Sequence, residues 1–167
     1  MGRKARFTPT LFVALAVMAL PLAAEAQLAK RGTYASHFPW QIAPKSMPLG
    51  ADHTLLVYEV TGTHLNDAGT GFLHGAAVVC YGMNDIRKGV ANNRGHCTAT
   101  DRDGDKAFAG YECRSSQPGA RCEGELQWVG GTGKYSGITG KSTWYPVGAP
   151  GGTHGYSVWK GEWQLPD

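Results

Sequence analysis

The stretch Gly130-Gly131-Thr132-Gly133-Lys134-Tyr135-Ser136-Gly137-Ile138-Thr139-Gly140 indicates the fold more firmly than any other part of the sequence. It reads as a glycine-rich turn that runs into a strand, with small and large residues interleaved. Glycines this dense within a strand pattern mark bulges, tight bends or close approaches of backbones. A small, strongly curved sheet or barrel needs these features, so the stretch points to an all-β fold.

The rest of the chain also indicates an all-β fold, because short strand-like runs follow one another from His53 onward. These runs are His53–Thr61, Gly71–Gly82, His96–Thr100, Lys106–Arg114, Cys122–Gly130, Lys134–Tyr145 and Thr153–Gln164. Turn residues such as Asp103-Gly104 and Pro118-Gly119 separate them, and no stretch after the N-terminal segment has a convincing helical period. Seven or eight short strands with regular turns indicate an antiparallel barrel or sandwich.

The N-terminal segment has the pattern of a signal peptide over residues 1–26. A basic start precedes the apolar run Leu11–Leu22, and Ala24-Glu25-Ala26 fits the small-x-small cleavage rule. An uncleaved membrane anchor is the alternative, but the run is shorter than the roughly 20 apolar residues that span a bilayer. We expect a periplasmic or secreted protein that begins at about Gln27, with no later membrane span.

The remaining chain divides into an extended N-terminal segment, 27–50, and a barrel domain, 51–167. The first is rich in proline and glycine and lacks periodicity. The formal net charge of +3 falls to +1 without residues 1–26, which hold three basic residues and one acidic residue. A nearly neutral chain without a Lys/Arg cluster argues against nucleic acid as a partner.

Four cysteines, Cys80, Cys97, Cys113 and Cys122, are expected to form disulfides in an exported chain. Cys113 and Cys122 flank a short loop with Pro118-Gly119, and Cys80 and Cys97 flank a longer polar loop. We therefore expect one disulfide within each hairpin. A zinc site is the alternative, but the chain has no Cys-x-x-Cys and no usual Cys/His spacing, so no metal is expected.

Glu59 is the strongest candidate for a catalytic residue. It shares one strand face with Leu55 and Val57, while Leu56, Tyr58 and Val60 take the other face. Since both faces are apolar, a carboxylate here loses contact with water and suits general acid–base chemistry. The alternative is a glutamate at the end of a strand that reaches solvent or pairs with an arginine.

Two other motifs imitate known ligand loops without completing them. Asp101-Arg102-Asp103-Gly104-Asp105 starts like a calcium loop, but Lys106 stands where that loop needs a glycine. We expect a polar hairpin turn there. Ile138–Ser142 imitates the end of a phosphate-binding loop, and Tyr135 stands at the place of its first glycine.

Three of these features together resemble the allene oxide cyclase barrel superfamily, which also includes plant dirigent proteins. Gly130–Gly140 resembles the Gly-Gly-(Thr/Ser)-Gly-x-(Tyr/Phe)-x-Gly signature of these proteins. Val57-Tyr58-Glu59-Val60 resembles the first strand of the plant cyclases, with its catalytic glutamate. Gly95–Tyr111 resembles their cysteine-bearing strand and the strand after it. The similarity covers roughly His53–Tyr145.

The resemblance implies a small antiparallel barrel of eight strands around an apolar cavity, working without a cofactor. Glu59 would polarise the substrate, and Tyr58, Cys97, Tyr111 and Trp128 would contact the ligand. In the cyclases an asparagine follows the glutamate by two residues, where this chain has Thr61. The plant cyclases are trimers, so a homo-oligomer is also implied.

Two functions follow as expectations. The first is an exported barrel that binds a small hydrophobic molecule, with cofactor-free cyclase, isomerase or dirigent-like activity as an extension. The second is a non-enzymatic protein of the cell envelope that associates with itself through apolar outer strand faces. The sequence does not distinguish an enzyme from a binding protein.

Overall fold

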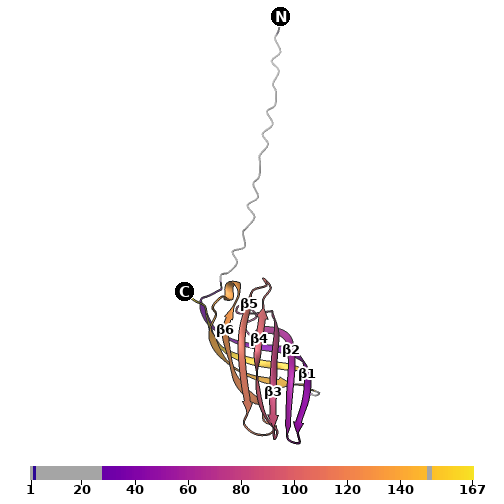
Figure 1. Cartoon of the computed structure of the whole chain (residues 1–167). Helices are drawn as coiled ribbons and strands as arrows, with labels where there is room; N and C mark the ends of the chain where they lie inside the picture. The colour runs from indigo at the N-terminus through magenta and orange to yellow at the C-terminus, as the bar shows by residue number, and fades with distance from the viewer. Residues whose placement is uncertain (1, 3–27, 150–151) are drawn as a thin grey trace.

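The computed structural model describes residues 2, 28–149 and 152–167, and these residues form a closed barrel of eight antiparallel strands (Figure 1). The strands are β1 (Arg31–Gly50), β2 (His53–Asn66), β3 (Ala76–Arg87), β4 (Val90–Thr100), β5 (Lys106–Ser115), β6 (Cys122–Gly131), β7 (Gly140–Gly148) and β8 (His154–Gln164), with one 3-10 turn, η1 (Gly133–Tyr135). Each strand pairs with its neighbours in the chain, and β8 pairs with β1. The predicted all-β barrel is confirmed. The predicted signal peptide and its cleavage before Gln27 lie, apart from Gly2, outside the described residues.

Glycines at inward positions make room for large rings from the neighbouring strand. Side chains alternate between the inside and the outside along each strand, as the pleat requires. Phe38 of β1 points inward and lies over Gly62 of β2, where an added Cβ would stand 2.7 Å from Phe38 Cε2. Trp40 lies over Gly155 of β8, where an added Cβ would stand 2.8 Å from Trp40 Cζ2. Aromatic rings beside glycines thus fill the barrel, as expected for a small barrel.

The N-terminal boundary of the barrel differs from the sequence expectation. Arg31–Gly50 is extended, but it is the first strand of the barrel and pairs with both β2 and β8. The domain therefore begins before residue 51. Its prolines obscured the strand pattern, because proline removes a backbone donor and is unusual inside a sheet.

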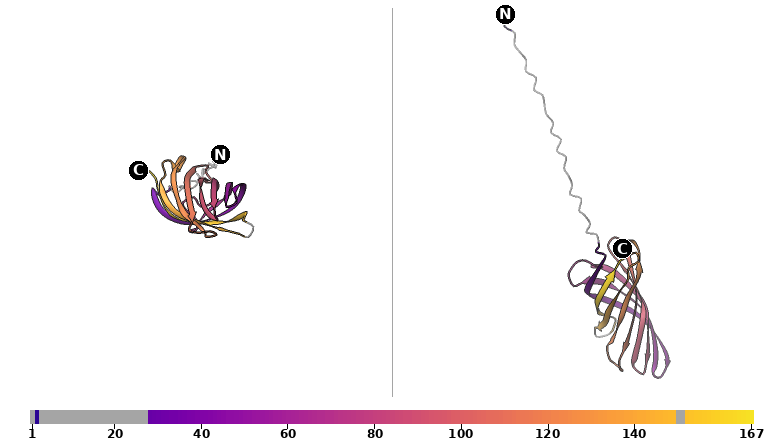
Figure 2. Two further views of the ribbon diagram at one scale, coloured as in Figure 1. Left: turned by 60° about the horizontal axis from the view of Figure 1, so that its bottom comes forward. Right: turned by 90° about the vertical axis from the view of Figure 1, so that its left-hand side faces the viewer.

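Strand β1 has two neighbours over only part of its length. Its pairing with β8 runs from Arg31 to Gln41, and Ile42 adds one backbone bond to Thr153, whereas residues 43–50 pair with β2 alone among the described residues. Pro44 and Pro48 lie in this second part, where one edge carries no ladder and proline is tolerated. The strands fan out toward this end of the molecule (Figure 2).

The end of the barrel that carries the chain termini is closed by packed side chains. The segment between β2 and β3 inserts Phe72 and Leu73, which are 4% and 2% exposed. The Phe72 ring stacks on Trp163 with centroids 4.8 Å apart and lies edge-on to Trp128 at 5.4 Å. These contacts form an aromatic plug, so the open part of the interior lies toward the other end.

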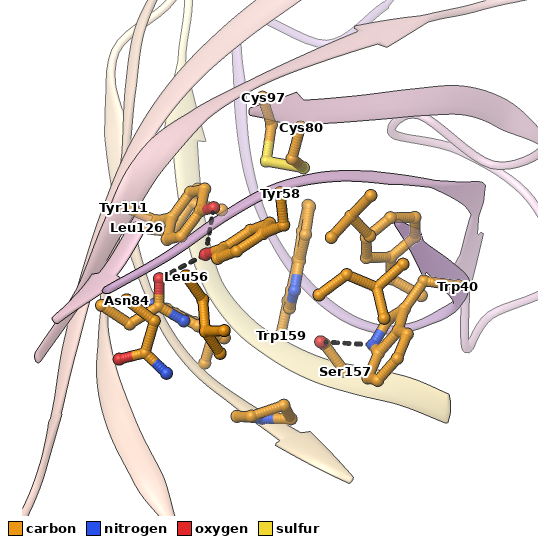
Figure 3. A pocket seen from close by; sticks show the side chains of 16 residues that line it. Trp40, Leu56, Tyr58, Cys80, Asn84, Cys97, Tyr111, Leu126, Ser157 and Trp159 are labelled. Atoms are coloured by element: carbon orange, nitrogen blue, oxygen red, sulfur yellow. Dashed lines mark hydrogen bonds between the residues drawn. A yellow bond between two sulfur atoms is a disulfide. The ribbon is translucent and has the colours of Figure 1, made fainter. Parts of the chain in front are cut away.

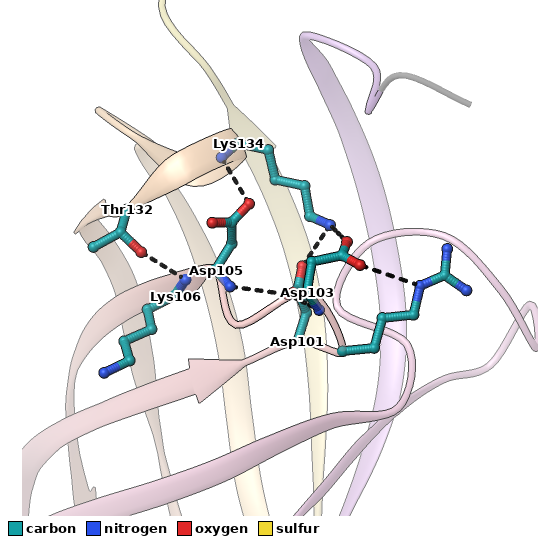
Figure 4. Close-up of polar contacts among 7 residues, drawn as sticks. Asp101, Asp103, Asp105, Lys106, Thr132 and Lys134 are labelled. Carbon is teal, nitrogen blue, oxygen red and sulfur yellow. Dashed lines mark hydrogen bonds and ion pairs between the residues drawn. The ribbon is translucent and has the colours of Figure 1, made fainter. Parts of the chain in front are cut away.

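The Asp101–Asp105 turn joins β4 to β5 and is held by Lys134 (Figure 4). Lys134 Nζ lies 2.6 Å from Asp101 Oδ2 and also pairs with Asp103. Asp105 Oδ2 accepts a hydrogen bond of 3.1 Å from the backbone N–H of Lys134. Desolvation lowers the pKa of Lys134, but its bonds to Asp101 and Asp103 outweigh this and raise the pKa. The predicted hairpin turn is confirmed, and it ties η1 to the barrel.

Two disulfides link neighbouring strands as expected. Cys80–Cys97 joins β3 to β4 with Cα atoms 4.0 Å apart, and Cys113–Cys122 joins β5 to β6 with Cα atoms 5.5 Å apart. Disulfides are typical of proteins in oxidising compartments. Across residues 28–149 and 152–167, the structure has no helix with the length and apolar character needed to cross a bilayer.

Candidate functional site

A cavity of about 220 Å³ lies inside the barrel (Figure 3). Its lining residues lie in the part of the barrel beyond the aromatic plug. The cavity is smaller than the roughly 300–1,000 Å³ typical of sites for drug-sized ligands. Apolar and aromatic side chains from all eight strands make up most of its wall. The lining residues are Phe38, Trp40, Ile42, Leu56, Tyr58, Val60, Cys80, Asn84, Asn93, Cys97, Tyr111, Leu126, Trp144, Pro146, Ser157 and Trp159.

A chain of three hydrogen-bonded side chains crosses one wall of the cavity. The Tyr58 hydroxyl donates to Asn93 Oδ1, and it lies 2.8 Å from the Tyr111 hydroxyl. Because the single proton of Tyr58 goes to Asn93, Tyr111 must donate to Tyr58. Desolvation by burial raises the pKa of both tyrosines. Both hydroxyls therefore stay protonated and neutral around pH 7.

Two glycines in the wall allow this arrangement. Gly82 of β3 and Gly95 of β4 are cross-strand partners. A Cβ at Gly82 would stand 2.7 Å from Tyr58 Oη, and one at Gly95 would stand 2.7 Å from Tyr111 Cζ. The hydroxyl ends of the two tyrosines thus occupy space that side chains at residues 82 and 95 would otherwise fill.

Trp40 and Trp144, two of the three tryptophans that line the cavity, have their indole N–H groups bonded to protein. Trp40 Nε1 donates to Ser157 Oγ at 3.0 Å. Trp144 Nε1 donates to the carbonyl oxygens of Glu112 and Glu125 at 3.2 and 3.1 Å. A buried N–H group without an acceptor would destabilise the fold. Because these two N–H groups are bonded, the carbon surfaces of both indoles can face the cavity without that loss of stability.

The structure brings three of the four expected ligand-contact residues to the cavity. Tyr58, Cys97 and Tyr111 are among its lining residues. Trp128 is not, because it is 3% exposed and belongs to the aromatic plug, with its ring 6.3 Å from that of Tyr34. The structure thus places Trp128 in the aromatic plug below the cavity and not in the cavity wall.

Glu59, the expected catalytic residue, does not reach the cavity. Its neighbours in β2, Tyr58 and Val60, line the cavity, so Glu59 points to the outer face. There it lies opposite Tyr81 of β3, and its hydrogen bond raises the pKa of the Tyr81 hydroxyl. The two apolar faces of the strand hid this orientation, which only the pairing of the strands decides.

Asn84 and Asn93 are cavity residues that the sequence did not reveal. The sequence predicts a long polar loop between Cys80 and Cys97, but β3 and β4 continue to a tight turn at Lys88-Gly89, with φ of 48° and 74°. Asn84 and Asn93 face each other across this hairpin. Polar residues at inward positions of a strand were the available signal, and they were read as loop composition.

Comparison with known proteins gives little further guidance. Neither a protein family nor a curated protein matches the chain. Among solved structures, a pterocarpan synthase dirigent protein is similar, with a TM-score of 0.49 and 13% identity over 84% of this chain and 90% of that one. A likeness at this level does not bear on what this chain binds.

Proposed function

We propose that this chain is an exported barrel protein that binds a small hydrophobic molecule in its interior cavity. The observation that supports the proposal is the cavity itself, whose wall consists mainly of aromatic and aliphatic side chains. Burying an apolar ligand gains about 25 cal/mol per Å² of surface removed from water. A wall with few polar groups provides this gain while those groups fix the orientation of the ligand.

Export is supported by two separate features. The first 26 residues have the sequence pattern of a cleaved signal peptide. All four cysteines form disulfides, as is usual in the periplasm or outside the cell. Both features favour a periplasmic or secreted protein.

Any chemistry in this cavity would act through confinement. Among the described residues that line it, none carries a carboxylate, an ammonium, a guanidinium or an imidazole. A dirigent-like role needs no such group, because holding a reactive molecule in one conformation is enough to direct its reaction. We therefore propose binding as the primary function and guidance of a reactive ligand as its extension.

The proposal is tested by filling the cavity from one strand. Leu56 lines the cavity, whereas its neighbour Val57 is 49% exposed on the outer face. We expect 2-isopropenylnaphthalene to bind the wild type in isothermal titration calorimetry. Leu56→Trp should weaken this binding at least about tenfold because the indole occupies the ligand volume. Equal binding to Leu56→Trp and to the control Val57→Trp would refute an interior site.

Self-association in the cell envelope is the second candidate, and the outer face favours it. Val57, Tyr81 and Val129 are 49%, 62% and 60% exposed. They line an outer hollow across β2 to β6 with Met83, and such patches are often interaction sites. A second copy of the chain would cover them. Sedimentation velocity should then show an oligomer that Tyr81→Asp dissociates and Tyr156→Asp does not, and a monomeric wild type would exclude this candidate.

A further inference from the structure

Asn84 and Asn93 form a pair of amides at the cavity. They are direct cross-strand partners on β3 and β4, and both line the cavity. Opposite residues of an antiparallel pair have Cβ atoms about 4.5–5.5 Å apart. Their side-chain amides can therefore contact one atom of a ligand at the same time.

The hydrogen bonds of this pair leave its N–H groups available. Asn93 Oδ1 accepts from Tyr58, which fixes the amide and directs Nδ2 away from that hydroxyl. Within the described part of the chain, neither amide nitrogen has a protein partner, and neither is among the fully buried polar atoms. Each NH₂ group carries two donors. The pair thus presents donors to the cavity.

Asn84 is not explained by stability. Its Oδ1 atom is buried without a hydrogen-bond donor among the described residues. A buried acceptor without a partner destabilises a fold, and a leucine of similar size would remove that cost. A residue that lowers stability at a cavity wall is a candidate for ligand contact.

The residues around the Asn84 and Asn93 amides favour an uncharged ligand group as the acceptor for their N–H groups. The cavity wall described above has no charged side chain, and its tyrosines stay neutral because burial raises their pKa. A carboxylate or ammonium that entered would lose its hydration without meeting an opposite charge, which is strongly unfavourable. A carbonyl oxygen accepts two N–H bonds without this cost.

We infer that Asn84 and Asn93 bind an uncharged acceptor oxygen of the ligand, of the carbonyl type, between their two amide N–H groups. This inference rests on the proposed function and narrows it. The ligand class becomes a neutral, largely apolar molecule with a carbonyl at one end. Fatty acids and other apolar acids are excluded from it.

Matched probes test the inference. 2-Acetonaphthone carries a ketone, 2-isopropenylnaphthalene replaces the ketone oxygen with CH₂, and 2-naphthoate carries a charged carboxylate. Calorimetry on the full-length folded protein gives the affinity ratio of ketone to alkene, and comparing variants cancels their different solubilities in water. Asn84→Leu should lower this ratio about 3- to 10-fold, the effect expected for one or two hydrogen bonds. Asn92→Leu, on the exposed face of β4, is the control and should not change it.

Each result decides between distinct conclusions. If the alkene binds and Asn84→Leu leaves the ratio unchanged, the inference is wrong while interior binding stands. Binding of 2-naphthoate as tight as that of the ketone would also overturn it. If the wild type binds neither neutral probe, the proposed function fails and the inference with it. Asn84→Ala serves as a second variant for binding, and unfolding in urea must show that Asn84→Leu is at least as stable as the wild type, since a structural role of the amide would lower the stability of this variant.

Discussion

Replacing Gly82 by alanine is a direct test of how the cavity wall is built. Gly82 lies in β3 beneath the tyrosine pair, and its missing side chain makes room for both hydroxyls. An added Cβ would stand 2.7 Å from Tyr58 Oη and 2.8 Å from Tyr58 Cζ, and nearer still to Tyr111 Oη. Contacts this short force both rings to move. The movement must break the Tyr111–Tyr58–Asn93 hydrogen-bond chain.

The expected loss of stability combines three effects. Overpacking of a closed wall costs about 1–3 kcal/mol, and a lost hydrogen bond costs about 0.5–1.5 kcal/mol. The lower flexibility of alanine in the unfolded chain returns about 0.4–1 kcal/mol. We therefore expect the free energy of unfolding of Gly82→Ala to fall by about 0.5–4 kcal/mol.

Gly110→Ala is the matched control because it also changes a glycine in the middle of a strand. Its added Cβ would meet only His96 Cε1 and Nδ1, at the ordinary distances of 3.5 and 3.6 Å. Urea unfolding followed by tryptophan fluorescence should show a midpoint about 1 M lower for Gly82→Ala and no decrease for Gly110→Ala. Equal midpoints for the two variants would refute the account of the wall.

Three further predictions follow from other parts of the barrel. Lys134→Met should lower stability by about 1–2 kcal/mol, because the Asp101 carboxylate, which is 7% exposed, loses its partner. This value is reduced because the Lys134 side chain is partly exposed to solvent. Desolvation raises the pKa of Asp101, but the bond to Lys134 outweighs it and the pKa is lowered. The loss of stability in Lys134→Met should therefore be complete above pH 4 and shrink as the pH falls through the lowered pKa. An equal loss in the exposed control Lys141→Met would contradict this account. Burial lowers the pKa of His64 from 6.5 to about 4, so wild-type stability should decline by about 1 kcal/mol per pH unit as the pH falls from 6.5 toward 4. The stability of His64→Gln should depend less on pH when urea midpoints are compared at pH 7 and 4.5. Parallel pH profiles of the two proteins would show that the histidine is not involved. The double variant Cys113→Ala/Cys122→Ala should lower stability by about 3 kcal/mol and leave the affinity for 2-isopropenylnaphthalene unchanged. The double variant Cys80→Ala/Cys97→Ala should lower both stability and affinity, because this pair lines the cavity. Equal binding by the two double variants in calorimetry would contradict the lining role.

Local backbone chemistry explains why the fold was predictable from Gly130–Gly140. Gly130, Gly133, Gly137 and Gly140 have φ values of 142°, 52°, 72° and 145°, which other residues rarely adopt. At Gly140 an added Cβ would also stand 2.8 Å from the Cα of Trp163. The requirement for glycine is therefore local, and the sequence shows it directly. The expected strand starts later, at Gly140, because η1 occupies Gly133–Tyr135.

The site was less predictable because it depends on contacts between distant segments. Alternation shows that Tyr58 and Glu59 face opposite ways, but only the closure of the barrel decides which of them is inside. The depth of Trp128 is decided by Phe72, which enters the barrel from the segment between β2 and β3. Asn84 and Asn93 looked like loop residues until the register of β3 with β4 placed them inward.

The part of β1 that pairs with only one strand among the described residues also affects whether copies of this protein can add strands to one another. Ile42 donates its N–H to Thr153 O on the β8 side, so the N atoms of residues 44, 46 and 48 point the same way along the free edge. Two of these three residues are Pro44 and Pro48, which have no N–H to offer. Among the described residues of this edge, an approaching strand would find a donor only at Ser46, which is too little to start a ladder. The barrel can thus keep one seam unpaired at high concentration without exposing a template for fibre growth.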